Sequence, residues 1–129
     1  MSSLTLLLID DEPAFGQFVQ DAAALCGYET TVTLSADAFQ ARFRACAPSV
    51  VALDLGMPKG DGIEILRFLA DENCTAPILI MSGFDDRVLD SSKRLGQALG
   101  LTIAGALSKP IRLAELIAAL QAIHPAGQQ

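Results

Sequence analysis

The sequence predicts one α/β domain in which a doubly wound parallel sheet is covered by helices on both faces, giving three layers. Short apolar runs alternate with longer segments of helical periodicity, which is typical of repeated strand–helix units. The apolar runs are continuous, as expected of strands that are buried on both faces. A chain of 129 residues has room for roughly five such units when their connections are short.

The first two units occupy the beginning of the chain. The apolar run Leu4–Ile9 predicts a buried strand. Pro13 suits the first turn of a helix, and apolar residues then follow at helical spacing until Gly27, which can end that helix. Residues Glu29–Leu34 predict a second strand, and the side chain of Ser35 can cap the next helix.

The remaining units follow the same alternation. Three further strands are expected, at Ser49–Leu53, Pro77–Met81 and Leu101–Leu107. The helices after them are expected to begin at Ile63, at Asp85 or Asp86, and at Leu113, and to end near Glu72, Leu99 and Ile123. Glycines and prolines predict a loop over 56–62, and the chain is expected to be a tail from about His124. We therefore expect residues 1–129 to form one domain.

Composition excludes several classes of function. Hydrophobic residues make up 51% of the chain, which argues against disorder. The net charge of −6 repels phosphate backbones, so no direct nucleic-acid binding is expected. No apolar stretch is long enough to span a bilayer and no secretory signal is visible, so no membrane association is expected. The odd number of cysteines fits a reducing compartment, so a cytoplasmic location is expected.

Polar side chains follow four of the five predicted strands. They are Asp10 and Asp11, Asp54, Ser82, and Lys109. Ligands of open parallel sheets bind beyond the carboxyl ends of the strands. A flavodoxin-like strand order of 2-1-3-4-5, which we adopt from known folds rather than derive, makes the first and third strands neighbours. The three carboxylates then converge at one edge of the sheet.

Three converging carboxylates need a compensating partner. A like-charge pair about 4 Å apart costs roughly 4 kcal/mol at an effective dielectric constant near 20. Either one carboxyl group binds a proton or a hard cation lies between them. Oxygen ligands suit Mg²⁺ or Mn²⁺, and no histidine or cysteine completes a zinc site. A carboxylate beside such an ion, here Asp54, can attack phosphorus, while Lys109 and Ser82 bind the phosphoryl oxygens.

Four segments of the sequence resemble the receiver domain of two-component response regulators. They are LLLIDDEP (Leu6–Pro13), VVALDLGMPKGDGIEIL (Val50–Leu66), ILIMSG (Ile78–Gly83) and ALSKPI (Ala106–Ile111). The second segment is the most specific, because an aspartate ends an apolar strand and is followed by Met57-Pro58 and Asp61-Gly62 at the spacing of the family. The resemblance covers essentially the whole chain.

The resemblance implies a role for each matching residue. Asp54 matches the phosphoacceptor, Ser82 and Lys109 match the residues that bind the phosphoryl group, and the Lys109–Pro110 peptide bond would be cis. The implied Mg²⁺ site combines Asp54 with Asp11, the backbone carbonyl of Gly56, and Asp10 through water. Met57, Pro58 and Gly62 are expected to shape the loop and the start of the next helix.

The resemblance also implies partners. The phosphoryl group would come from a histidine kinase or a histidine phosphotransfer protein, and the output would pass through a further domain or a homodimer. Such a domain is not an enzyme in the usual sense, because it catalyses only its own phosphorylation and dephosphorylation. The stretch Ser82–Pro110 is further similar to receivers fused to EAL-type cyclic-di-GMP phosphodiesterase domains.

One position departs from the family pattern. Receivers usually carry tyrosine or phenylalanine three residues before the lysine, and this ring moves inward on phosphorylation. Here the position is Ala106, whose side chain has no rotamer to change, so an atypical switch is expected. Two alternatives stay open. The first is a Mg²⁺-dependent phosphohydrolase, although Gly56 stands where the second acid of such an enzyme is expected. The second is an interaction module that has lost the switch.

Overall fold

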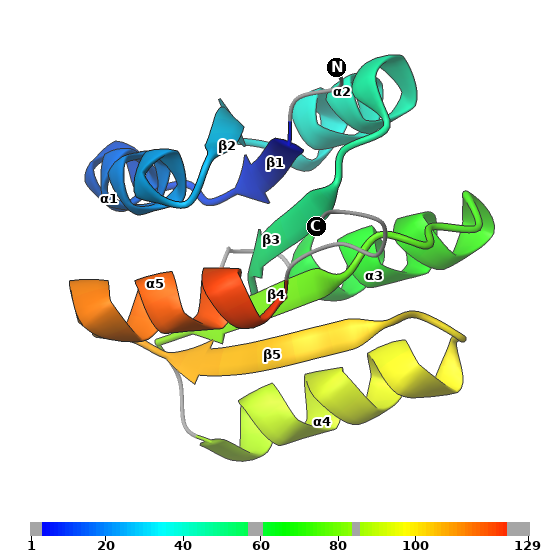
Figure 1. Cartoon of the computed structure of the whole chain (residues 1–129). Helices are drawn as coiled ribbons and strands as arrows, with labels where there is room; N and C mark the ends of the chain where they lie inside the picture. The colour runs from blue at the N-terminus through cyan, green and yellow to red at the C-terminus, as the bar shows by residue number, and fades with distance from the viewer. Residues whose placement is uncertain (1–3, 57–60, 84–85, 124–129) are drawn as a thin grey trace.

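The computed structural model describes residues 4–56, 61–83 and 86–123 (Figure 1). The strands are β1 (Leu4–Ile9), β2 (Tyr28–Thr33), β3 (Val50–Asp54), β4 (Ile78–Ser82) and β5 (Ile103–Ser108). The helices are α1 (Pro13–Leu25), α2 (Ala36–Cys46), α3 (Asp61–Asp71), α4 (Asp86–Ala98) and α5 (Leu113–Ala122). Met57, Pro58 and the tail expected from His124 lie outside the described residues.

The strands form one parallel sheet in the order β2-β1-β3-β4-β5, which confirms the predicted flavodoxin-like fold. Helices α1 and α5 contact each other on one face, and α3 contacts both α2 and α4 on the other (Figure 1). In the pairing of β1 with β3, Ile9 lies opposite Leu53. The residues that come next, Asp10 just after β1 and Asp54 at the last position of β3, therefore lie side by side at the carboxyl edge of the sheet.

Two apolar cores lie on the two faces of the sheet, because successive side chains of a strand point to opposite sides. Leu7 and Ile9 of β1 belong to the core under α2, α3 and α4, whereas Leu6 and Leu8 belong to the core under α1 and α5. All five residues of β3 and of β4 are buried. This double burial is the reason that the sequence shows unbroken apolar runs there.

The predicted bounds of β2, β3 and β4 are each offset by one residue, and two other elements begin two residues away from their predicted starts. Helix α3 begins at Asp61, ahead of the predicted start at Ile63. Strand β5 begins at Ile103 rather than Leu101, because Leu101 is used to close helix α4. The backbone N–H of Leu101 donates to Gly96 O and that of Gly100, whose φ is +86°, donates to Gln97 O. This is a Schellman motif, in which glycine supplies the left-handed residue.

Candidate functional site

The carboxylates of Asp10, Asp11 and Asp54 form one cluster, which we call the acid cluster, at the carboxyl ends of β1 and β3. One oxygen of each lies within 4.8 Å of the others. Asp10 and Asp54 are buried, whereas Asp11 is exposed. The buried carboxylates are held by their own loops: Glu12 N donates to Asp10 Oδ1 at 2.9 Å, and Gly56 N donates to Asp54 Oδ1 at 2.9 Å. The local backbone therefore fixes the direction of both groups.

Among the described residues, Lys109 is the one whose ammonium lies at the acid cluster. Its Nζ lies 2.9 Å from Asp10 Oδ2, 3.6 Å from Asp54 Oδ1 and 3.5 Å from Glu12 Oε1. The loop after β5 places the side chain there, since Lys109 N donates to Ser82 O at 2.7 Å. The Lys109–Pro110 peptide bond is cis, as the resemblance implies.

Burial and charge shift two pKa values at the site. Burial raises the pKa of Asp54, and the charges of Asp10 and Asp11 raise it further, against the lowering effects of the Gly56 N–H bond and the Lys109 ammonium. Burial lowers the pKa of Lys109, but its hydrogen bond to Asp10 and the charges of Asp54, Asp10 and Glu12 outweigh burial. The net result is a raised pKa, so Lys109 stays protonated at neutral pH.

The donor set of the acid cluster fits a hard divalent cation. Its three carboxylates exceed the single neighbouring ammonium in charge, so an additional cation reduces their repulsion. Carboxylate and carbonyl oxygens are the ligands that Mg²⁺ prefers. Gly56, the source of the implied carbonyl ligand, lines a pocket of about 340 Å³ together with Asp11, Asp54 and Lys109. Asp10, Asp11, Asp54 and Gly56 are therefore the residues that would hold the ion.

Ser82 and Ala106 lie on the neighbouring strands β4 and β5. Ser82 is buried at the end of β4, one residue beyond Met81, which pairs with Asp54. Ala106 is half-buried, lies opposite Ile80 and packs against the core under α2, α3 and α4. Among the described residues of β5 there is no aromatic side chain, and the side chain of Ala106 is a single methyl group.

Gly62 lies where α3 approaches the backbone of the site. It is buried, and a Cβ atom there would lie 3.0 Å from Leu55 Cδ2 and 3.1 Å from Leu55 Cα. The absence of a side chain therefore lets the helix start directly against the residue after Asp54.

Sequence reasoning missed two residues of the site. Glu12 contacts the Lys109 ammonium at 3.5 Å, and its place directly after two aspartates was an available signal. Phe15 is one of the apolar residues that follow Pro13 at helical spacing, and its ring also lies over Lys109 Nζ, 4.0 Å from the ring centroid. No periodicity could have revealed this contact, because it joins α1 to a loop at the other end of the chain.

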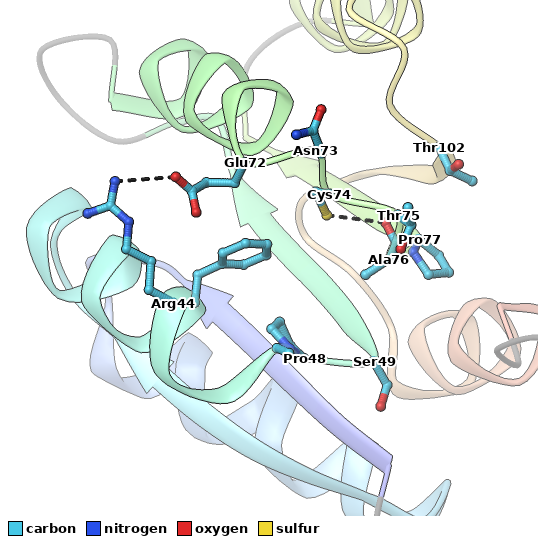
Figure 2. A pocket seen from close by; sticks show the side chains of 12 residues that line it. Arg44, Pro48, Ser49, Glu72, Asn73, Cys74, Thr75, Ala76, Pro77 and Thr102 are labelled. Atoms are coloured by element: carbon cyan, nitrogen blue, oxygen red, sulfur yellow. Dashed lines mark hydrogen bonds and ion pairs between the residues drawn. The ribbon is translucent and has the colours of Figure 1, made fainter.

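A larger pocket than the one at the acid cluster lies elsewhere in the molecule. This pocket, of about 770 Å³, is lined by Ser49, Pro77 and Thr102, which precede β3, β4 and β5, so it opens at the edge opposite the acid cluster (Figure 2). On one side Arg44 reaches across to Glu72 at 3.4 Å, in an ion pair that is largely open to solvent. The pocket therefore lacks the converging buried charges that mark the acid cluster, and volume is here a poor guide to chemistry.

Fold and site together define the class of flavodoxin-like α/β domains that carry an acidic site at the carboxyl edge of a parallel sheet. The family description "Response regulator receiver domain" matches residues 6–121, and this chain belongs to that family. Over 125 residues the chain is 34% identical to the transcriptional regulatory protein TrcR of Mycobacterium tuberculosis, a match that covers 95% of this chain and 46% of TrcR. The chain is 35% identical over 120 residues to the transcriptional regulatory protein KdpE of the same species, and the match covers 91% of this chain and 49% of KdpE.

Solved structures agree with this assignment. A response regulator from Colwellia psychrerythraea superimposes with a TM-score of 0.77 at 26% identity, covering 94% of this chain and 96% of that one. The chemotaxis protein CheY4 of Vibrio cholerae shares the fold, with a TM-score of 0.80, 24% identity, and 95% and 99% of the two chains covered.

Two further properties of the chain concern its length and its helices. The chain spans about half the length of the curated relatives it matches. In the described ranges, no helix is both long and apolar enough to cross a bilayer.

Proposed function

We propose that this chain accepts a phosphoryl group on Asp54 from a phosphohistidine, using a divalent cation held at the acid cluster. The observation that carries the proposal is the placement of one buried carboxylate, Asp54, among two further acids and the Lys109 ammonium. Phosphoryl transfer needs positioning and charge neutralisation more than proton transfer, and these residues supply both.

The transfer is a displacement at phosphorus. An oxygen of Asp54 attacks the phosphorus of the donor, so that a new O–P bond forms as the P–N bond to the histidine ring breaks. The electron pair of that bond stays on the ring nitrogen, and because the other ring nitrogen of the donor histidine carries a proton, the imidazole leaves neutral. The hydrogen bond from Gly56 N holds the Asp54 carboxylate in a fixed direction for this attack.

The charge on the transferred group is balanced by the residues around Asp54. Bound Mg²⁺, or Mn²⁺, would neutralise phosphoryl oxygens as a Lewis acid. The Lys109 ammonium would bind a further phosphoryl oxygen, and the buried hydroxyl of Ser82 would donate a hydrogen bond to another. Because these groups act on the chain's own carboxylate, the domain is a phosphoacceptor that catalyses only its own phosphorylation and dephosphorylation.

Intact mass measurement tests the proposal directly. The protein is incubated with acetyl phosphate and Mg²⁺, so that acetate leaves as the aspartyl phosphate forms. We expect one phosphoryl group per chain, none in Asp54→Asn, and one in the control Asp71→Asn, whose carboxylate is exposed at the end of α3. Release of many phosphates per chain would instead identify a phosphohydrolase, and the absence of any adduct would contradict phosphoacceptance.

Ala106 favours a second candidate function. A receiver without a switching ring can act as an interaction module that binds its partner in one state only. Under this alternative the acid cluster still binds Mg²⁺, but acetyl phosphate leaves the affinity for partners unchanged. The phosphohydrolase alternative is weaker, because Gly56 offers no acid side chain two residues after Asp54.

The family supports a partner class and a location. We propose a histidine kinase or histidine phosphotransfer protein as the donor, in the cytoplasm, where the three free cysteines would stay reduced. The curated relatives TrcR and KdpE are transcriptional regulators about twice as long as the match, which supports an output domain as the receiver of the signal. An EAL-type domain or a homodimer in this role is proposed from the sequence resemblance alone.

A further inference from the structure

The aromatic ring of Phe15 covers the ammonium of Lys109. Nζ lies 4.0 Å from the ring centroid. Phe15 belongs to the first turns of α1, where it is half-buried and packs against Phe18 at 5.7 Å between ring centroids. The lysine comes from the loop after β5, so this contact ties the beginning of the chain to its last strand.

The position of the ring matches the needs of the ammonium. The face of a phenyl ring carries partial negative charge and attracts a cation, more strongly when water is excluded. Only 15% of the Lys109 side chain is exposed. The carboxylates of Asp10, Asp54 and Glu12 lie 2.9, 3.6 and 3.5 Å from Nζ. The ring is a fourth neighbour among the described residues, and it contacts the ammonium through its face rather than through a hydrogen bond.

We propose that Phe15 is a positioning residue that holds the Lys109 ammonium at the acid cluster. A lysine carries its charge on a flexible stem of four carbons and needs neighbours to fix it. A cation or a phosphoryl group bound at the acid cluster would compete with Lys109 for Asp10 and Asp54. The ring of Phe15 has no charge to lose, so it keeps the ammonium in place throughout. The consequence for phosphorylation rests on the proposed function of Asp54.

Nuclear magnetic resonance tests the contact without any phosphoryl donor. Protons next to Nζ that lie over a phenyl ring are shifted upfield by the ring current. We expect such a shift for the Cε protons of Lys109, compared with exposed Lys93, and its loss in Phe15→Leu. A Lys109 resonance that coincides with that of Lys93, or that does not move in Phe15→Leu, would overturn the proposal.

A series of fluorinated phenylalanines at position 15 tests the electrostatic part of the contact. Each added fluorine weakens the negative face of the ring while nearly preserving its shape. The rate of adduct formation from acetyl phosphate, measured at saturating Mg²⁺, should fall stepwise by about threefold to tenfold in total. The same series at Phe18, which packs beside Phe15, should leave the rate unchanged, and Phe15→Tyr should keep it near that of the wild type.

The outcomes separate this inference from the proposed function. If the adduct forms at one rate across the whole series, Phe15 does not position Lys109, and phosphoacceptance by Asp54 still stands. If the wild-type protein forms no adduct, phosphoacceptance fails, and the ring-current shift alone decides whether Phe15 holds the ammonium. A purely structural role of Phe15 would make the Phe18 series behave like the Phe15 series.

Discussion

The ammonium of Lys109 lies 2.9 Å from a carboxylate oxygen of Asp10, although 99 positions separate the two residues in the chain. The Asp10 side chain has no exposed surface and that of Lys109 has 15%. An ion pair of this kind stabilises little by itself, but removal of one partner leaves a buried charge without compensation. The contact therefore couples the stability of the fold to the electrostatics of the site.

From this pair we expect Lys109→Ala to lower the free energy of unfolding by roughly 3 kcal/mol in the absence of metal. Addition of Mg²⁺ should restore part of the loss, because a cation at the acid cluster replaces the missing charge. Urea denaturation with EDTA and with Mg²⁺ measures both effects. Lys93→Ala, on the exposed side of α4, is the control, and an equal loss there would contradict the explanation.

The raised pKa of Asp54 predicts a pH-dependent gain of stability in Asp54→Asn. The fold disfavours the ionised form of the Asp54 carboxyl, so ionisation lowers the free energy of unfolding. The contribution of the protonated group to that free energy is fully present below its unfolded pKa, about 4, and is lost as pH rises through the higher folded pKa. The amide oxygen of asparagine can still accept the bond from Gly56 N. Thermal unfolding in EDTA should show a higher melting temperature for Asp54→Asn near neutral pH and no difference in acid. A gain that persists in acid would point to another cause.

The acid cluster predicts specific stabilisation by Mg²⁺. We expect Mg²⁺ to raise the melting temperature of the wild-type protein, and Asp11→Asn to weaken the apparent affinity by roughly tenfold or more. Asp11 is exposed, so its replacement should leave the metal-free melting temperature nearly unchanged. Calorimetric titration measures the affinity, with Asp71→Asn as the control. Equal affinity in Asp11→Asn would remove this residue from the metal site.

The close approach at Gly62 predicts that Gly62→Ala is destabilising. Its Cβ would lie 3.1 Å from Leu55 Cα, a backbone atom that cannot move without displacing the site, so we expect a loss of roughly 1–3 kcal/mol. Gly83→Ala is a matched control, because a Cβ there would meet its nearest neighbour, Lys109 Cβ, at 4.0 Å. Chemical denaturation compares the two, and equal effects would show that sterics at Gly62 are not the cause.

Ala106 predicts where the phosphorylated state differs from the free one. Because β5 has no ring to reorient, we expect beryllofluoride, a phosphoryl mimic, to change amide exchange at Ser82 and along α4 more than around Ala106. Hydrogen–deuterium exchange with and without beryllofluoride measures this. Unchanged exchange over 83–100 would show that the signal does not leave the site through α4.

Much of this arrangement could be predicted from residues alone, because local rules govern it. Unbroken apolar runs identify strands buried on two faces, and the polar residues that follow four of the five strands mark the edge where ligands bind. Leu101 was misassigned because an apolar residue can close a helix as well as begin a strand. The ring of Phe15 over Lys109 could not be predicted, since that contact depends on how α1 packs beside a loop that is distant in sequence.

The pairing of Ile9 with Leu53 has a consequence for how this chain can fail. A slip of one position along β1 would turn Leu6 and Leu8 toward the wrong layer and withdraw Asp10 from Asp54 in the same movement. Because both layers are apolar, the slipped strand would stay buried, but its side chains would no longer fit their new neighbours. The close packing that fixes the register of β1 therefore also keeps Asp10 beside Asp54.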